Sequence, residues 1–218
     1  MIGRPASTLI DGPAGHIEVV VEEPAAKPLG LAVVAHPNPQ MGGTMDNKVV
    51  HTICRAFVLA GWRAVRFNFR GVGRSEGEWD EGRGETMDLL AVVGHHLSDP
   101  DMVGHPLALA GFSFGGAMAA QACARLMEVA ALRPGVVAPS ELVLISPAVS
   151  RFDVPVVPQH TLIVEGEQDD VVPLTHILDW ARPQGLPVTV VPGTGHFFHG
   201  QLPRLREIVL RHLRGVAE

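Results

Sequence analysis

A serine flanked by glycines near the middle of the sequence could act as a nucleophile. Residues 107–110 form an apolar run, residues 111–115 read Gly-Phe-Ser-Phe-Gly, and small, helix-favouring residues follow. A strand, a sharp turn and a helix in this order raise a serine hydroxyl above the edge of a sheet. Glycines suit such a strained turn, because a Cβ on either side of the serine would crowd the backbone. Ser113 is therefore the candidate nucleophile.

Two later segments supply an acid and a histidine that could activate this serine. A serine hydroxyl is a weak nucleophile at neutral pH and needs a general base, which a third group orients. One apolar run is followed by Asp169 and Asp170, and the next is followed by His196. Functional groups on a parallel sheet collect at the carboxyl ends of the strands. The order of serine, acid and histidine thus predicts Ser113 and His196 as catalytic residues, with either aspartate as the acid.

Other histidines are weaker candidates for the base. His176 and His212 fall within expected helices, and His199 lies in the same loop as His196. His196 is favoured because it follows the end of a strand most directly. His36 is interpreted as structural.

No metal or cofactor is expected from the sequence. Gly71 and Gly73 follow a strand but lack the third glycine and the helix of a dinucleotide site, and residues 111–116 lack the lysine of a phosphate loop. The adjacent His95 and His96 do not share a helix face and make a poor metal site.

The composition favours a cytoplasmic protein that binds neither nucleic acid nor membranes. The chain has 218 residues, of which 46% are hydrophobic, and a net charge of −6 without a basic cluster. Cys54 and Cys123 fall within expected helices, which suits core residues in a reducing compartment. Residues 1–5 lack the apolar stretch of a signal peptide. The uncharged run at 107–124 contains Gln121 and several glycines, so a buried strand and helix explain it better than a membrane span.

Apolar runs of strand length alternate with helical patterns, which predicts a parallel sheet covered on both faces in a single domain, residues 1–218. Strands are expected at 7–10, 16–21, 29–35, 62–69, 107–110, 142–145, 161–164 and 188–191. Helices are expected at about 46–61, 84–98, from the serine turn to about 129, at 174–181 and at 204–216. Asp46 is the expected N-cap of the first helix. The second helix is expected to carry an apolar face formed by Met87, Leu90, Val93 and Leu97.

Five motifs together resemble the α/β-hydrolase superfamily, and in particular the small, lidless, dienelactone-hydrolase-like bacterial serine esterases. They are Gly-Phe-Ser-Phe-Gly-Gly, Gly-Glu-Gln-Asp-Asp-Val-Val-Pro, Gly-Thr-Gly-His-Phe-Phe, His-Pro-Asn-Pro-Gln-Met-Gly-Gly and Arg-Gly-Val-Gly-Arg-Ser. The resemblance implies an α/β-hydrolase fold, with a mostly parallel sheet of about eight strands, helices on both faces and no lid. It also implies that the acid is Asp169, the aspartate of Gly-x-x-Asp, and that Asp170 is structural or a loop contact. True dienelactone hydrolases use a cysteine nucleophile, so Ser113 favours ordinary ester hydrolysis.

The oxyanion hole of such an enzyme needs two backbone donors. One is expected from Phe114, the residue after the nucleophile, and the other from the loop after the strand at 29–35. Prolines have no N–H to donate, so Asn38 is the better donor in His-Pro-Asn-Pro-Gln and Gln40 is the second choice. The prolines also stiffen the loop, which favours a preorganised donor.

The expected activity is that of a carboxylesterase acting on short-chain or small, exposed esters through an acyl-enzyme. The segment at 148–159 is too short for a lid, so the site should be open, with Met41, Phe197 and Phe198 lining it. Met45 and Trp79 are further lining candidates. Alternatives are a thioesterase, peptidase or lactonase using the same residues, or a non-catalytic scaffold. The expected partner is a small ester, and the expected state is a monomer or homodimer.

Overall fold

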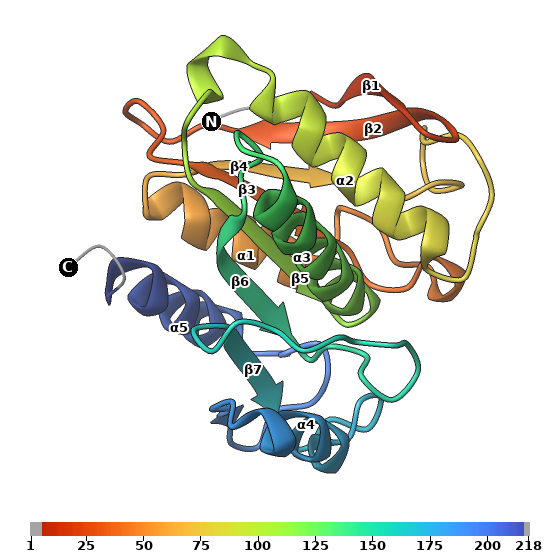
Figure 1. Ribbon diagram of the computed structural model, residues 1–218. Helices are drawn as coiled ribbons and strands as arrows, with labels where there is room; N and C mark the ends of the chain where they lie inside the picture. The colour runs from red at the N-terminus through yellow and green to blue at the C-terminus, as the bar shows by residue number, and fades with distance from the viewer. Residues whose placement is uncertain (1–5, 216–218) are drawn as a thin grey trace.

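The computed structural model describes residues 6–215 and shows one sheet between two layers of helices (Figure 1). The eight strands lie in the order β1-β2-β4-β3-β5-β6-β7-β8. Strands β4, β3, β5, β6, β7 and β8 are parallel, whereas β2 runs antiparallel to both β1 and β4. The fold class expected from the sequence is confirmed.

The strands are β1 Thr8–Gly12, β2 Gly15–Glu22, β3 Leu31–Ala35, β4 Arg63–Phe67, β5 Leu107–Phe112, β6 Pro139–Ile145, β7 Leu162–Gly166 and β8 Thr189–Val191. The α-helices are α1 Lys48–Leu59, α2 Arg83–Leu97, α3 Phe114–Leu132, α4 Leu174–Ala181 and α5 Leu202–Gly215. Short 3₁₀ helices cover Pro39–Met41, Pro100–Met102 and Arg182–Gln184. Two earlier assignments fall outside the described residues, namely Val216 at the end of the last helix and the N-terminal residues 1–5.

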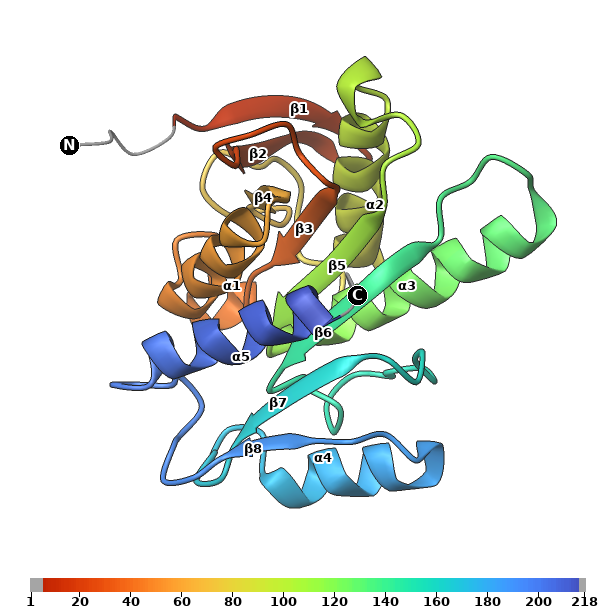
Figure 2. The same cartoon turned by 90° about the vertical axis from the view of Figure 1, so that its left-hand side faces the viewer.

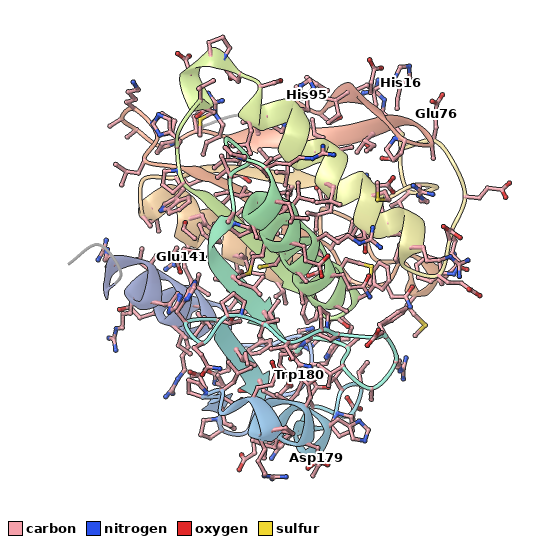
Figure 3. The ribbon with its side chains drawn as sticks, viewed as in Figure 1. His16, Glu76, His95, Glu141, Asp179 and Trp180 are labelled. Carbon is pink, nitrogen blue, oxygen red and sulfur yellow. The ribbon has the colours of Figure 1, made fainter. Side chains whose placement is uncertain are left out.

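Each face of the sheet has its own hydrophobic core. Helices α1 and α5 pack on one face, and α2 and α3 pack on the other (Figure 2). Strands β3 and β5 are buried at every residue because helices cover both of their faces. On one of these faces, Glu141 of β6 lies beside α5 (Figure 3), and its Oε2 is 3.1 Å from Nε2 of His212.

Two details of the helices were predicted wrongly. Helix α1 is capped by Asn47 rather than Asp46, since the Asn47 side chain accepts a hydrogen bond from the Val49 amide. In α2, Met87 is 44% exposed, while Asp88 is buried. Asp88 forms an ion pair with Arg70, so this polar side chain can face the core. The spacing of hydrophobic residues could not reveal Arg70 as the partner of Asp88.

The connection between β6 and β7 contains no helix or strand, so no lid domain is inserted there. In the part of the chain that is described, no helix combines the length and hydropathy required to span a bilayer.

Candidate active site

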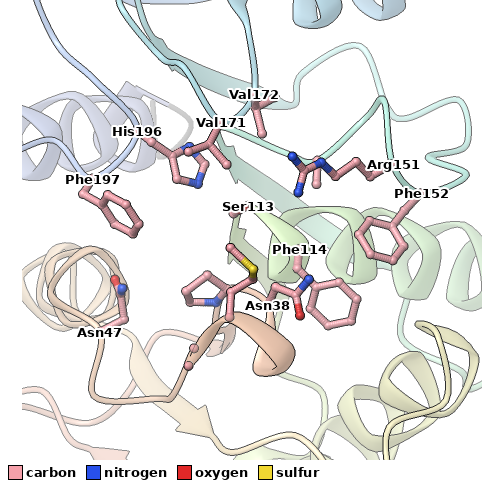
Figure 4. Close-up of a pocket in the computed structure, with 15 residues that line it drawn as sticks. Asn38, Asn47, Ser113, Phe114, Arg151, Phe152, Val171, Val172, His196 and Phe197 are labelled. Carbon is pink, nitrogen blue, oxygen red and sulfur yellow. The ribbon is translucent and has the colours of Figure 1, made fainter.

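Four loops carry the candidate residues to one edge of the sheet. Asn38 follows β3, Ser113 follows β5, Asp169 follows β7 and His196 follows β8. These strands are parallel, so their carboxyl ends meet at the same edge. Figure 4 shows Asn38, Ser113 and His196 around one cavity.

Ser113 sits in a strained turn between β5 and α3. Its backbone has φ 56° and ψ −118°, a region that non-glycine residues rarely occupy. The Ser113 amide donates a 2.9 Å hydrogen bond to the carbonyl of Ile145, which fixes this conformation. A Cβ on Gly111 would overlap the Gly115 carbonyl, and a Cβ on Gly115 would overlap the Ala35 carbonyl. The two glycines are therefore required by the close packing of the turn.

His196 and Asp169 form a buried hydrogen-bonded pair. Asp169 Oδ2 lies 2.6 Å from His196 Nδ1, which must carry the proton in a bond to a carboxylate. The other oxygen of Asp169 accepts bonds from the amides of Val171 and Val172 at 2.9 and 2.7 Å. Because Nδ1 is protonated, Nε2 of the neutral ring is free to accept a proton. Asp170 is exposed and takes no part in this pair.

Asp169 is held in its ionised form. Burial would raise its pKa, but hydrogen bonds from His196, from the Glu165 side chain and from the Val172 amide outweigh burial and lower the pKa below its ordinary value. The carboxylate therefore remains charged across the neutral range and can orient the imidazole.

The loops after β7 and β8 approach each other closely at Gly166. A Cβ on this residue would overlap the carbonyl of Thr194, and Gln168 N–H donates a 2.9 Å hydrogen bond to the same carbonyl. This contact brings Asp169 and His196 within reach of each other.

Asn38 and Phe114 are the residues expected to supply the two oxyanion donors. Both line the cavity that contains Ser113. The Asn38 side chain accepts the Gln40 amide at 2.8 Å, so the second-choice donor is already engaged. Among residues 6–215, the backbone amide of Asn38 has no hydrogen-bond acceptor. The Phe114 amide opens α3, where helix amides lack intrahelical partners.

His36 anchors the loop that carries Asn38. Its ring is fully buried, Nδ1 donates to the Pro37 carbonyl at 2.6 Å, and Nε2 accepts the Phe69 amide at 3.0 Å. Burial lowers the pKa of His36 to about 4, so the ring is neutral at physiological pH. The structural role of this histidine is therefore to fix the turn after β3.

The cavity has a volume of about 240 Å³ and a largely apolar lining. Met41 and Phe197 line it as predicted, but Phe198 does not. Phe198 has no exposed surface and packs in the core against α5, because the turn after His196 sends two successive aromatic rings in opposite directions. The lining consists of Pro37, Asn38, Met41, Gly42, Gly43, Asn47, Ser113, Phe114, Ala148, Arg151, Phe152, Val171, Val172, His196 and Phe197.

Several lining residues were missed from the sequence. Met45 and Trp79, the further candidates, do not line the cavity, whereas Arg151, Phe152 and Asn47 do. The only available signal for Arg151 and Phe152 was their place in the short segment between β6 and β7.

No hydrogen bond joins Ser113 to His196 within the described part of the chain, although both side chains line the cavity. Bonds of this kind often tighten only when substrate is bound. In the same part of the chain, no group of three or more His, Cys, Asp or Glu residues could hold a metal ion.

Comparison with known proteins gives several similarities. The family model described as serine aminopeptidase S33 matches residues 40–173, a stretch that contains Ser113 and Asp169 and ends before His196. An α/β serine hydrolase homologue from Coxiella burnetii is 36% identical, with a TM-score of 0.78 over 98% of this chain and 99% of that one. An α/β serine hydrolase without lid from Xanthomonas campestris is 35% identical, with a TM-score of 0.85 over 98% of this chain and 95% of that one. An uncharacterized protein from Rickettsia prowazekii is 29% identical in an alignment of 201 residues that covers 86% of this chain and 80% of the relative.

The packing of the serine turn predicts a large effect of a single methyl group. We expect Gly115→Ala to lower the free energy of unfolding by about 2 kcal/mol or more, because the Cβ would overlap backbone of β3. Gly94→Ala in α2 is the matched control, since a Cβ there meets nothing within 4 Å. The control should raise stability by about 0.5–1 kcal/mol in urea unfolding. Equal effects of the two substitutions would contradict this view of the turn.

The buried neutral His36 predicts a pH-dependent stability. An unfolded histidine has a pKa near ~6.5, so the unfolded chain binds the extra proton first as the pH falls toward 4, and the folded state is destabilised. This group should account for about 2 kcal/mol of the stability lost between pH 7 and pH 4.5.

Urea unfolding of His36→Gln at both pH values tests this expectation, with the exposed His199→Gln as control. The loss between the two pH values should shrink in His36→Gln alone. An unchanged loss in that variant would show that His36 is not kept neutral by the fold.

Proposed function

This chain belongs to the serine aminopeptidase S33 family of α/β hydrolases, and we propose that it cleaves carboxylic esters through an acyl-enzyme on Ser113. The resemblance to lidless α/β serine hydrolases that its motifs indicated is confirmed. The observation that carries the proposal is the buried 2.6 Å bond between His196 and Asp169, with His196 lining the cavity beside the strained serine. This arrangement supports a serine–histidine–aspartate triad.

In the proposed reaction, Ser113 Oγ attacks the ester carbonyl while His196 Nε2 takes the hydroxyl proton. Asp169 stabilises the imidazolium, and the amides of Asn38 and Phe114 bind the oxyanion. The tetrahedral intermediate collapses, and His196 gives its proton to the leaving alcohol. Water then attacks the acyl-enzyme, again with His196 as base, and releases the acid and free Ser113.

The cavity supports a small substrate. Its volume of about 240 Å³ is below the ~300–1,000 Å³ of most ligand pockets. The absence of a lid between β6 and β7 leaves the cavity open, so larger leaving groups could extend into solvent. Short acyl chains therefore fit the proposal best.

The same residues could also act on thioesters, amides or lactones, which need the same nucleophile and oxyanion donors. A panel of these four bond types at equal concentration would separate the activities. A non-catalytic scaffold remains a distinct alternative, and it predicts no turnover of any of them.

Replacement of the nucleophile tests the proposal. Ser113→Ala should lower kcat for a short p-nitrophenyl ester by about a thousandfold or more, while urea unfolding stays close to that of the parent chain. Ser140→Ala, at a serine on the opposite end of β6 from the site, is the matched control and should keep full activity. Substantial turnover by folded Ser113→Ala would refute the assignment.

Arg151 predicts a preference for acidic esters. It is the one permanently charged side chain in the lining, and its guanidinium points toward Val172 (Figure 4). Arg151 is exposed, so an ion pair with a substrate carboxylate contributes ~0.2–1 kcal/mol, or up to about fivefold in affinity. We expect Arg151→Gln to lower kcat/KM about threefold to fivefold for an ester bearing a carboxylate, with no measurable change for its neutral analogue.

The exposed Arg133→Gln removes the same charge away from the cavity and should change neither value. Equal effects of Arg151→Gln on both esters would argue against an anionic substrate.

A further inference from the structure

A second carboxyl group lies buried behind the proposed triad. Glu165 is in β7, four residues before Asp169, and has no exposed surface. Its Oε1 accepts a 2.9 Å hydrogen bond from the Ser146 hydroxyl and a 3.0 Å bond from the Gly166 amide. Ser146 itself is held at φ 43°, a left-handed conformation that is costly for serine. Two defined donors therefore hold this oxygen in place.

The other oxygen, Oε2, is buried and has no donor among the described residues. Asp169 nevertheless acts on this carboxyl group through hydrogen bonding and through its charge, and both effects raise the pKa of Glu165. Two carboxylates are both acceptors, so such a bond requires a proton on one of them. Asp169 already accepts bonds from His196 and two amides, which favour its ionised form. The proton therefore belongs on Glu165.

The charges around Glu165 agree with this assignment. Burial and then the neighbouring Asp169 raise the pKa of Glu165 to about 9. Asp169 is the charged group that acts on Glu165, and Asp169 in turn is hydrogen-bonded to His196. A buried neutral acid avoids the cost of a second uncompensated charge beside Asp169.

We propose that Glu165 is a positioning residue, which donates a hydrogen bond from its protonated Oε2 to Asp169 and so fixes that carboxylate against His196. This inference rests on the proposed function of Ser113, Asp169 and His196. The donated bond disperses part of the charge of Asp169 without adding a net charge. His196 is then less strongly held as an imidazolium and remains available as a base to lower pH.

Two substitutions separate this role from simple packing. Glu165→Gln keeps an acceptor for Ser146 and Gly166 and a permanent N–H donor for Asp169, whereas Glu165→Leu keeps bulk without a donor. Glu141→Gln is the matched control. Glu141 is another buried glutamate, but it lies in β6 and pairs with His212. All three variants are first checked by urea unfolding.

We expect the parent enzyme to lose kcat/KM above about pH 9, where Glu165 ionises, and Glu165→Gln to keep its activity there. At pH 7–8, Glu165→Gln should stay within about threefold of the parent, because its amide replaces the acid proton. Glu165→Leu should lose about tenfold in kcat with little change in KM. The acid limb of its kcat/KM–pH profile should move to higher pH by about half a unit or more. Without the donated hydrogen bond, the full charge of Asp169 stabilises the His196 imidazolium. Glu141→Gln should reproduce the parent profile.

Three results would overturn the inference. They are an acid limb in Glu165→Leu that matches the parent, an alkaline loss that persists in Glu165→Gln, and equal losses of kcat in both variants. NMR titration of the His196 imidazole keeps this test separate from that of the proposed function, because it requires no turnover. A parent chain without ester turnover, whose His196 titration still shifts upward in Glu165→Leu, would refute the proposed function and support the positioning role.

Discussion

The backbone conformation of Ser113 is the constraint on which the site depends. A serine at φ 56° is unstable in isolation, so the surrounding packing must hold it. The carbonyl of Ile145 on β6, the close contact of Gly115 with Ala35 on β3, and the start of α3 all contribute. Because these contacts come from buried central strands, the core of the sheet holds the backbone of Ser113 in place.

The site also depends on how buried charge is balanced. Asp169 is a buried carboxylate that is tolerated because amides and His196 donate to it. The neutral states proposed for Glu165 and found for His36 complement it, since each supplies a hydrogen bond next to the reacting groups without another charge. The site thus concentrates one negative charge behind the imidazole, where the proposed mechanism would use it to stabilise an imidazolium.

Sequence reasoning identified the fold and the residues at strand ends, because those depend on patterns along the chain. Alternating apolar runs predicted the sheet, and the order of Ser113 and His196 followed from it. The preference for Asp169 over Asp170 came from family resemblance alone. Phe198 and Arg151 show the limit, since which loop side chain enters a cavity depends on local turns that no periodicity encodes. Glu165 drew no attention because Ser146, whose hydroxyl donates to it, lies on another segment.

The central claim is that Ser113 is a nucleophile activated by His196, and covalent labelling tests it most directly. The chain would be treated with a fluorophosphonate probe and analysed by intact and peptide mass spectrometry. The account predicts a single adduct on Ser113 that forms about a hundredfold or more slowly in His196→Ala. Absence of an adduct, an adduct on another residue, or an unchanged rate in His196→Ala would contradict it.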